Sequence, residues 1–328
     1  MQRGLAIALV LCGNAPGARA DVTVDVTLTP AGTAMARQLG VSADDLAQRL
    51  HDRIDSVVGT DGASLQAFSD AAVLSSHGLG VDYVSVPESL IVGVAANAAS
   101  SSGDLAALDR PIGGLAANIA VMAGLNLSPF GHGRWTVYGS GFYRAATFDG
   151  IDGAITNGAA HVQYTVIPAT ADRVARWTGL ELTTGLELTR WTLGSERAMG
   201  TTFSVEGQPI GYDMTGHFQL ASSSLAVPVE LSTGVRVAVV SVYAGVGLDL
   251  VQGHGTIDAQ LTGPVHDLDG RELGTVTITG HDSHGASPFA ARALAGVQLE
   301  AWKLKVFGHV NAAADSATSV GIGVRGVL

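Results

Sequence analysis

Residues 177–192, WTGLELTTGLELTRWT, alternate between apolar and polar side chains with a period of two. Four leucines, from Leu180 to Leu188, occupy one phase of the alternation, and Glu181 and Glu187 belong to the other. Side chains of a β-strand point alternately to opposite faces of a sheet. The stretch therefore predicts a strand with one apolar face and one polar face.

The same alternation recurs along most of the chain and predicts twelve strands, within a range of ten to fourteen. Turn-rich stretches such as 148–153 and 266–270 separate the strands. The predicted strands are 77–87, 89–99, 113–127, 133–147, 156–167, 177–192, 213–232, 234–251, 271–281, 286–300, 302–313 and 317–328.

Strand length and composition distinguish a membrane barrel from a soluble sandwich, which would also show alternation. Several runs keep phase for ten to fifteen residues, whereas ordinary strands average about five or six residues and strands that cross a bilayer need about nine to eleven. Hydrophobic residues make up 47% of the sequence and charged residues only 14%. We therefore predict an all-β fold, an antiparallel up-and-down transmembrane β-barrel, because a closed barrel leaves no unpaired edge in lipid.

Residues 112–133 form a long uncharged stretch that has the length of a transmembrane helix. Its odd positions from Leu115 to Leu127 are apolar, whereas Asn118 and Asn126 fall on even positions. A period of two, with scattered glycines and asparagines, favours a strand over a helix.

The first twenty residues are typical of a secretory signal peptide. A basic start leads into the apolar run from Leu5 to Leu11, and Ala18-Arg19-Ala20 forms an A-x-A cleavage site. An alternative makes Cys12 a lipidated N-terminus, but the residue before a lipidated cysteine should be small, and here it is Leu11.

Removal of residues 1–20 leaves 308 residues with 16 basic and 29 acidic side chains, a net charge of −13. This acidic balance argues against nucleic acid as a partner. Cys12 is the single cysteine, so the mature chain offers no disulfide, no thiolate chemistry and no cysteine-based zinc site. We predict no cofactor and no bound metal.

Residues 21–76 differ from the rest of the chain. Residues 22–28 alternate as a short strand, and Ser42 with Asp45 resembles a capping box that starts a helix. Residues 61–75 predict a second helix. The apolar positions assigned to these helices include Leu46, Leu50, Ile54 and Phe68.

A unit of ~55 residues buries too little surface to fold alone. We expect it to pack on the barrel formed by 77–328, either as a plug in the lumen or as a cap on the periplasmic mouth. The sequence is compatible with two roles for this unit: a plug that gates the barrel, or a segment that only stabilises it.

The last strand carries the most specific resemblance. Val320, Ile322 and Val324 share one phase, and the chain stops in that phase at Leu328. This resembles the C-terminal strand of bacterial outer-membrane barrels, although those usually end on an aromatic residue. The resemblance implies insertion by the barrel-insertion machinery through this strand, a place in outer-membrane lipid, and a monomer. The plug-plus-barrel layout is loosely similar to long-chain fatty-acid transporters, with no residue motif to confirm that family.

The strand phases place nine charged side chains on the lumen face. These lumen-lining candidates are Arg134, Arg144, Glu181, Glu187, Arg236, Arg292, Glu300, Lys303 and Arg325. Mixed charges in a lumen are compatible with a water-filled constriction or with a salt-bridged interior. We expect a passive channel or transporter for small or hydrophobic molecules, restricted by the plug; the alternative is a structural barrel without transport.

An enzyme is the third hypothesis and rests on His281 and Ser283, which would point the same way on a strand. Outer-membrane phospholipases and lipid A deacylases are similar in carrying His-x-Ser on one strand. No orienting residue can be named, and Gly280 and Gly285 favour a loop. His281 and His284 alone are also too few ligands for a metal. We therefore expect no enzymatic activity.

Overall fold

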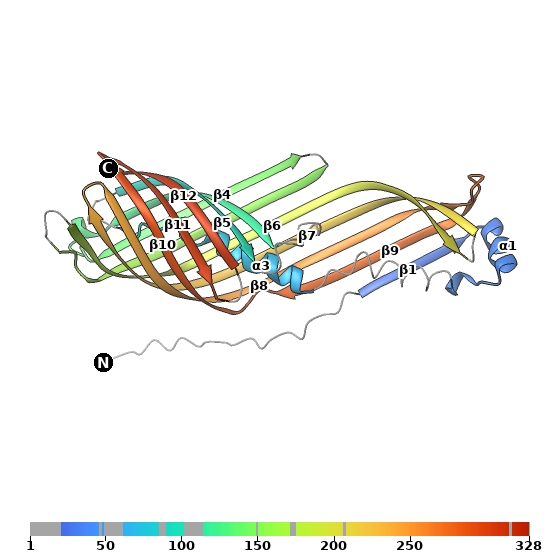
Figure 1. Cartoon of the computed structure of the whole chain (residues 1–328), viewed down its shortest axis with the longest axis horizontal. Coiled ribbons are helices and arrows are strands. Elements are labelled where there is room, and N and C mark those ends of the chain that lie inside the picture. Colours follow the sequence, from blue (N-terminus) through green and yellow to red (C-terminus); the bar gives the residue numbers. More distant parts are fainter. Residues whose placement is uncertain are drawn as a thin grey trace.

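The computed structural model describes residues 21–45, 48, 62–84, 90–101, 114–148, 150–170, 175–205, 208–314 and 317–327 (Figure 1). Within these residues, twelve strands form one antiparallel sheet. The strands are β1 (Asp21–Leu28), β2 (Leu90–Ser101), β3 (Leu115–Asn126), β4 (Trp135–Phe148), β5 (Ile151–Ile167), β6 (Ala175–Val205), β7 (Gln208–Val237), β8 (Val240–His266), β9 (Glu272–Gly285), β10 (Phe289–Ala301), β11 (Leu304–Ala313) and β12 (Ala317–Val327).

Ten of these strands close into a ring because β8 has three neighbours. It pairs with β7 along most of its length, with β10 through its first part and with β9 through its last part. The ring order is β2, β3, β4, β5, β6, β7, β8, β10, β11 and β12, and β12 pairs with β2 to complete it. The predicted transmembrane barrel is confirmed, with an even number of ring strands as is typical of single-chain bacterial barrels.

Two predicted strands account for the difference between twelve and ten. Residues 77–84 are turn and coil and form no strand. Residues 271–281 and 286–300 correspond to β9 and β10, which lie one after the other along β8 and so occupy one place in the ring. Residues 115–126 form β3, followed by the short 3-10 helix η2 (Ser128–Phe130), so the alternative of a transmembrane helix over 112–133 is wrong.

The outer face of the ring is apolar and the inner face is polar. On β12, Val320 and Ile322 are 56% and 66% exposed, whereas Ser319 and Arg325 are buried. Other exposed apolar side chains of the ring include Leu115, Ile119, Val121, Leu186, Leu188, Val242, Val246 and Val297. Such a continuous apolar belt faces lipid. No helix in the described ranges has the length and hydropathy needed to cross a membrane.

One end of the ring has short turns and the other carries a long extension (Figure 1). The turn at residues 238–239 joins β7 to β8, and the turn at 302–303 joins β10 to β11. The strands β6, β7 and β8 have 31, 30 and 27 residues, far more than the nine to eleven or so that a bilayer requires. Their distal parts, together with β9, form a sheet beyond the opposite end of the ring.

The N-terminal strand and the first helix lie on this sheet extension. The predicted strand over 22–28 is confirmed as β1, which pairs with β9 from Asp21↔His281 to Leu28↔Gly274. The helix α1 (Pro30–Leu39) was not among the predicted elements, although its signals are present. Thr29 caps its start by accepting a hydrogen bond from the Gly32 amide at 3.2 Å, and Gly40 ends it with φ 73°.

The predicted capping box is present. The Ser42 amide donates to Asp45 Oδ2 at 3.0 Å, and the Asp45 amide donates to Ser42 Oγ at 3.1 Å. Residues 43–45 and 48 are helical, whereas the predicted plug residues Leu46, Leu50 and Ile54 lie outside the described residues. The second predicted helix is confirmed as α3 (Gly62–Ser76).

Candidate functional site

The helix α3 lies inside the barrel. Its Leu65, Phe68, Ala72 and Leu74 are buried, and Phe68 meets Trp191 of β6 edge to face, with ring centroids 6.1 Å apart. The wall side chains in the same cluster come from β2, β3, β6, β7 and β12: Ala99, Ala116, Trp191, Leu220 and Ala317. The helix α3 lacks the charged, water-facing side of a surface helix, since it carries no basic residue and one acidic residue.

That single acidic residue, Asp70, fixes α3 to the junction of β9 and β10. Ser287 donates its amide to Asp70 Oδ1 at 2.7 Å and its hydroxyl to Asp70 Oδ2 at 2.8 Å. Gln66 Nε2 donates to Ser287 Oγ at 3.1 Å. These charge-assisted hydrogen bonds hold the end of α3 nearest the extension.

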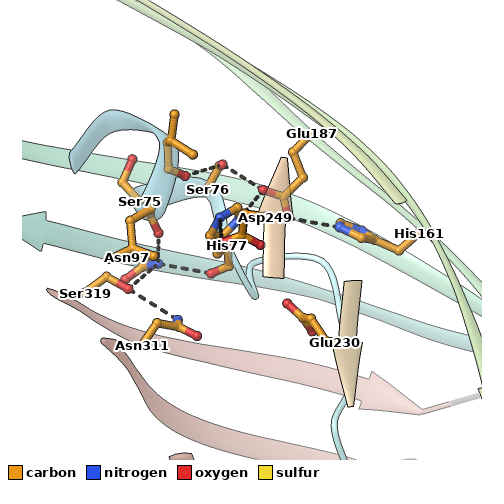
Figure 2. A network of polar contacts seen from close by, with 12 residues as sticks. Ser75, Ser76, His77, Asn97, His161, Glu187, Glu230, Asp249, Asn311 and Ser319 are labelled. Carbon is orange, nitrogen blue, oxygen red and sulfur yellow. Dashed lines mark hydrogen bonds and ion pairs between the residues drawn. The ribbon is translucent and has the colours of Figure 1, made fainter. Parts of the chain in front are cut away.

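The chain leaves α3 at His77, whose ring joins two walls of the lumen (Figure 2). His77 Nδ1 contacts Glu187 of β6, and His77 Nε2 lies 3.1 Å from Asp249 of β8. Glu187 also accepts from Ser76 Oγ at 3.0 Å and lies 3.0 Å from His161 Nε2 of β5. We call these residues, with Arg292 and Glu230, the His77 cluster.

Arg292 of β10 extends the cluster to β7 and β11. Its Nε lies 2.9 Å from Asp249 Oδ2, and its Nη2 contacts Glu230 of β7. Its Nη1 donates to Asn311 Oδ1 of β11 at 3.2 Å. All these side chains are buried. Charges removed from water in this way are stable only while each one keeps its partner.

Asn97 of β2 binds the C-terminal end of α3. Its Nδ2 donates to the carbonyl oxygens of Leu74, at 3.3 Å, and His77, at 3.1 Å (Figure 2). The last carbonyls of a helix have no partner within the helix. The barrel wall supplies one here, so the end of α3 is held in the lumen by its backbone as well as by side chains.

A second buried cluster surrounds Asp82 closer to the short turns; we call it the Asp82 cluster. Asp82 Oδ2 lies 3.3 Å from Lys305 Nζ of β11, and Asp82 Oδ1 lies 3.1 Å from Arg325 Nη1 of β12. Arg325 stacks over the Phe307 ring, 3.7 Å from its centroid. The Asp82 carboxylate therefore neutralises two cations of the wall.

The backbone and neighbours of Asp82 contact the other walls. Its carbonyl oxygen accepts from Tyr138 of β4 at 3.4 Å and from Gln163 of β5 at 3.3 Å. Tyr83 stacks on Tyr243 of β8 with ring centroids 5.4 Å apart. Leu79, Val81, Tyr83 and Val84 are all buried. Leu294 of β10 packs in one apolar cluster with Val81, Tyr83 and Val84. Among the described residues, each of the ten ring strands thus has at least one side chain that contacts residues 65–84, which occupy the lumen.

Four of the predicted lumen residues are buried inside the ring: Glu181, Glu187, Arg292 and Arg325. Glu181 accepts from Thr165 Oγ1 at 3.1 Å. Arg236 and Glu300 form an ion pair at 2.8 Å between strands next to the short turns, and both are partly exposed. Phe68, the described member of the predicted plug set, lies inside the lumen.

Three predicted lumen residues do not line the lumen. Arg134 precedes β4 and is exposed, Lys303 lies in the turn before β11, and Arg144 is exposed on the part of β4 that has no β3 partner. The prediction was wrong here because alternation identifies the face of a strand on which a side chain lies. It does not give the height of that side chain along the barrel axis.

Several interior residues were missed. Glu230, Asp249 and Lys305 stand in the polar phase of predicted strands, so the alternation could have identified them. His77 and Asp82 were assigned to a wall strand over 77–87, and no local signal distinguishes a wall strand from an extended segment that the wall surrounds.

His281 and Ser283 lie outside the ring, on β9. His281 Nδ1 is 2.7 Å from Asp258 Oδ1 of β8, and both side chains are more than half exposed. His281 and Asp258 border an open cavity of about 1090 Å³ at the extension, which Thr23 of β1 also lines. In the described part of the chain, Ser283 forms no hydrogen bond with His281.

Comparisons place the chain among sequences and folds. Residues 17–328 match the family described as Lsa36-like, and no curated protein matches. Ail, the attachment invasion locus protein of Yersinia pestis, is similar in structure at 12% identity and a TM-score of 0.26, over 73% of this chain and 96% of Ail.

Two further solved structures are similar. The TodX monoaromatic hydrocarbon channel shares 7% identity at a TM-score of 0.28, over 81% of this chain and 94% of TodX. The translocator domain of the autotransporter NalP from Neisseria meningitidis shares 13% identity at a TM-score of 0.21, over 84% and 97%. At these scores the likenesses carry no argument about what this chain does.

Proposed function

The chain belongs to the Lsa36-like family, and from the structure of this member we propose a structural barrel of the bacterial outer membrane without open passage. Its lumen is occupied by its own residues 65–84, and its sheet extension stands on one side of the membrane. We call residues 65–84 the lumen segment. The proposal rests on the two buried ionic clusters, the His77 cluster and the Asp82 cluster, that join this segment to the wall.

The energetics of these clusters favour a fixed segment over a gate. Withdrawal of residues 77–84 would take Asp82 away from Lys305 and Arg325, and His77 away from Glu187 and Asp249. Removal of one partner from a buried ion pair costs roughly 3–5 kcal/mol. Opening would require both clusters to break together, and the summed free-energy cost would strongly oppose it.

A gated channel is the second candidate, and the polarity of the wall favours it. The inner face of the ring carries hydroxyl and amide side chains that water could solvate if the segment left. Buried examples from different strands are Asn118, Gln163, Thr183, Ser232 and Gln298. The restricted channel expected from the sequence corresponds to this candidate.

Single-channel recording in planar bilayers tests the two candidates. The full chain is expected to give no conductance steps, and steady open steps would contradict the structural role. Asp82→Asn weakens the anchor of the segment, and Asp258→Asn, an exposed change on β8, is the matched control. Steps that appear in Asp82→Asn alone would favour the gated channel, whereas silence in both variants supports a filled structural barrel.

The proposal includes no catalytic step. The pairing of His281 with Asp258, rather than with Ser283, supports this view. Hydrolysis of phospholipid micelles by the purified chain that is abolished in Ser283→Ala would contradict it.

We also propose that β12 is the strand by which the insertion machinery recognises a monomeric chain. Val320, Ile322 and Val324 of β12 are exposed on its outer face, and Leu328 lies outside the described residues. Polar substitutions at Val320 and Ile322 are expected to lower the amount of chain recovered in the outer membrane.

A further inference from the structure

We infer that the barrel carries its own N-terminal segment across the membrane, so that residues 21–45 lie on the cell exterior while the end of β12 faces the periplasm. The inference concerns the side of the membrane on which the N-terminal segment lies. It therefore does not depend on whether the lumen conducts ions.

The lumen segment enters at the end of the ring next to the extension. Ala67 of α3 lies beside Gly114 and Ser101, because a Cβ atom added at Gly114 would be 3.3 Å from the Ala67 Cβ and 2.9 Å from the Ser101 Cβ. Ser101 ends β2 and Gly114 precedes β3. Asp70 binds Ser287 at the junction of β9 and β10. The start of α3 is thus at the far end of the ring from the short turns.

The segment leaves at the opposite end. Asp82 contacts Lys305, near the start of β11, and Arg325, near the end of β12. These two residues are cross-strand partners beside the turn at 302–303. The segment therefore runs from beside Ser101, the last residue of β2, to Lys305, near the first residue of β11. These two positions lie at opposite ends of the ring strands, so the segment passes through the length of the ring.

The residues before α3 lie beyond the ring. β1 pairs with β9, and β9 pairs with the distal part of β8 from His254 to His266. Thr29 ties the end of β1 to the sheet, since its amide donates to the Leu273 carbonyl at 2.9 Å. Figure 1 shows β1 and α1 along the extension, at the end of the molecule away from the C-terminus.

The order of the strands explains how a segment comes to be enclosed. The pairing of β12 with β2 completes the ring. The lumen segment directly precedes β2 and packs against both strands, through Ala99 and Ala317. It is enclosed when that seam closes, without passage through a finished barrel.

The two sides of the membrane follow from the connections at each end of the ring. The connections 127–134, 168–174, 238–239 and 302–303 lie at one end, whereas the other end carries the extension of β6–β8 and the connection between β2 and β3, beside short turns after β4 and β11. Bacterial barrels place their longest connections on the extracellular side, so the extension with β1 is extracellular and the end with the turns at 238–239 and 302–303 is periplasmic.

Cysteine labelling of whole cells tests this inference, because Cys12 is the single cysteine of the sequence. In a Cys12→Ala background, three variants each carry one exposed cysteine: Asp25→Cys on β1, Asp269→Cys at the β8–β9 turn and Lys303→Cys at the β10–β11 turn. Each variant is treated with a membrane-impermeant maleimide before and after permeabilisation of the outer membrane.

Asp25→Cys and Asp269→Cys are expected to show the full mass shift on intact cells, and Lys303→Cys only after permeabilisation. The inference would be overturned if Asp25→Cys were labelled only under the conditions that label Lys303→Cys, and not under those that label Asp269→Cys. Because Asp269 and Lys303 report the orientation of the barrel by themselves, a failed inference is distinguishable from a barrel that has not inserted.

A disulfide test addresses the register of β1 in the same cells. Thr23 and Thr279 are cross-strand partners with their hydroxyl oxygens 2.5 Å apart. Thr23→Cys with Thr279→Cys is expected to form a disulfide, whereas Thr27→Cys with Thr279→Cys, displaced by four residues or about 13 Å, is not. Equal yields in the two pairs would show that β1 is not held on β9.

Discussion

Arg292 is a buried side chain that joins several walls of the ring. From β10 it contacts Asp249 of β8, Glu230 of β7 and Asn311 of β11, so three neighbouring walls share one guanidinium. Arginine suits this position because its planar group donates in several fixed directions and stays charged when buried. Gly247 makes room for it, since a Cβ atom there would lie 3.2 Å from the Arg292 Cζ.

Arg292→Leu is expected to destabilise the folded barrel by roughly 3–5 kcal/mol, because Asp249 and Glu230 lose the buried guanidinium that both of them contact. Urea unfolding in detergent, followed by the gel-mobility difference between folded and unfolded barrels, measures the change. Lys303→Leu in the exposed turn is the control and should stay within about 0.5 kcal/mol of the parent. Equal effects of the two substitutions would count against a shared ionic interior.

Predictability at the residue scale had a definite limit. The phases of β6, β10 and β12 placed Glu187, Arg292 and Arg325 on the inner face, where the structure has them buried. The identity of their partners depends on cross-strand register and on a segment distant in sequence. Neither can be inferred from a period of two.

At the scale of elements, the N-terminal strand and helix form one unit with the tip of β9. Thr29 serves both parts. Its hydroxyl caps α1 at the Gly32 amide and lies 3.1 Å from the carbonyl oxygens of Glu272 and Leu273. Gly32 packs against the same carbonyl of Leu273, where a Cβ atom would be 1.8 Å away. The cap and the sheet contact therefore depend on each other.

Thr29→Ala is expected to cost about 1 kcal/mol locally through loss of the cap. Amide hydrogen exchange of residues 30–39 should speed up, while exchange in the ring strands stays unchanged. Thr29→Ser keeps the hydroxyl and should restore protection. If exchange in Thr29→Ser were as fast as in Thr29→Ala, the methyl group of Thr29, and not its capping hydroxyl, would be what stabilises α1.

The elements also show why strand counting overestimated the ring. Alternation identifies extended segments, and β9 and β10 are both extended. Whether two successive segments pair with each other or continue along one neighbour depends on β8 being long enough to serve both. The break at residues 286–288 joins two segments that pair with successive parts of β8.

At the scale of the whole molecule, a ten-stranded ring is built around a segment of its own chain. Small alanines on the wall admit α3, and buried ion pairs hold the turn and coil residues that follow it. The barrel architecture and the helical character of 62–76 were predictable from periodicity. The enclosure of 77–84 was not, because it results from ring closure between β2 and β12, which are far apart in the sequence.

A disulfide between α3 and the wall tests whether the helix lies in the lumen. Asp70→Cys with Ser287→Cys replaces two contacting side chains, whose oxygens are 2.8 Å apart. In outer membranes from a Cys12→Ala strain, this pair is expected to cross-link under mild oxidation. Asp70→Cys with Ser241→Cys is expected to remain reduced, because Ser241 lies at the start of β8 next to the turn at 238–239, at the opposite end of the ring. Absence of the first cross-link, or equal yields from both pairs, would contradict a barrel filled by its own chain.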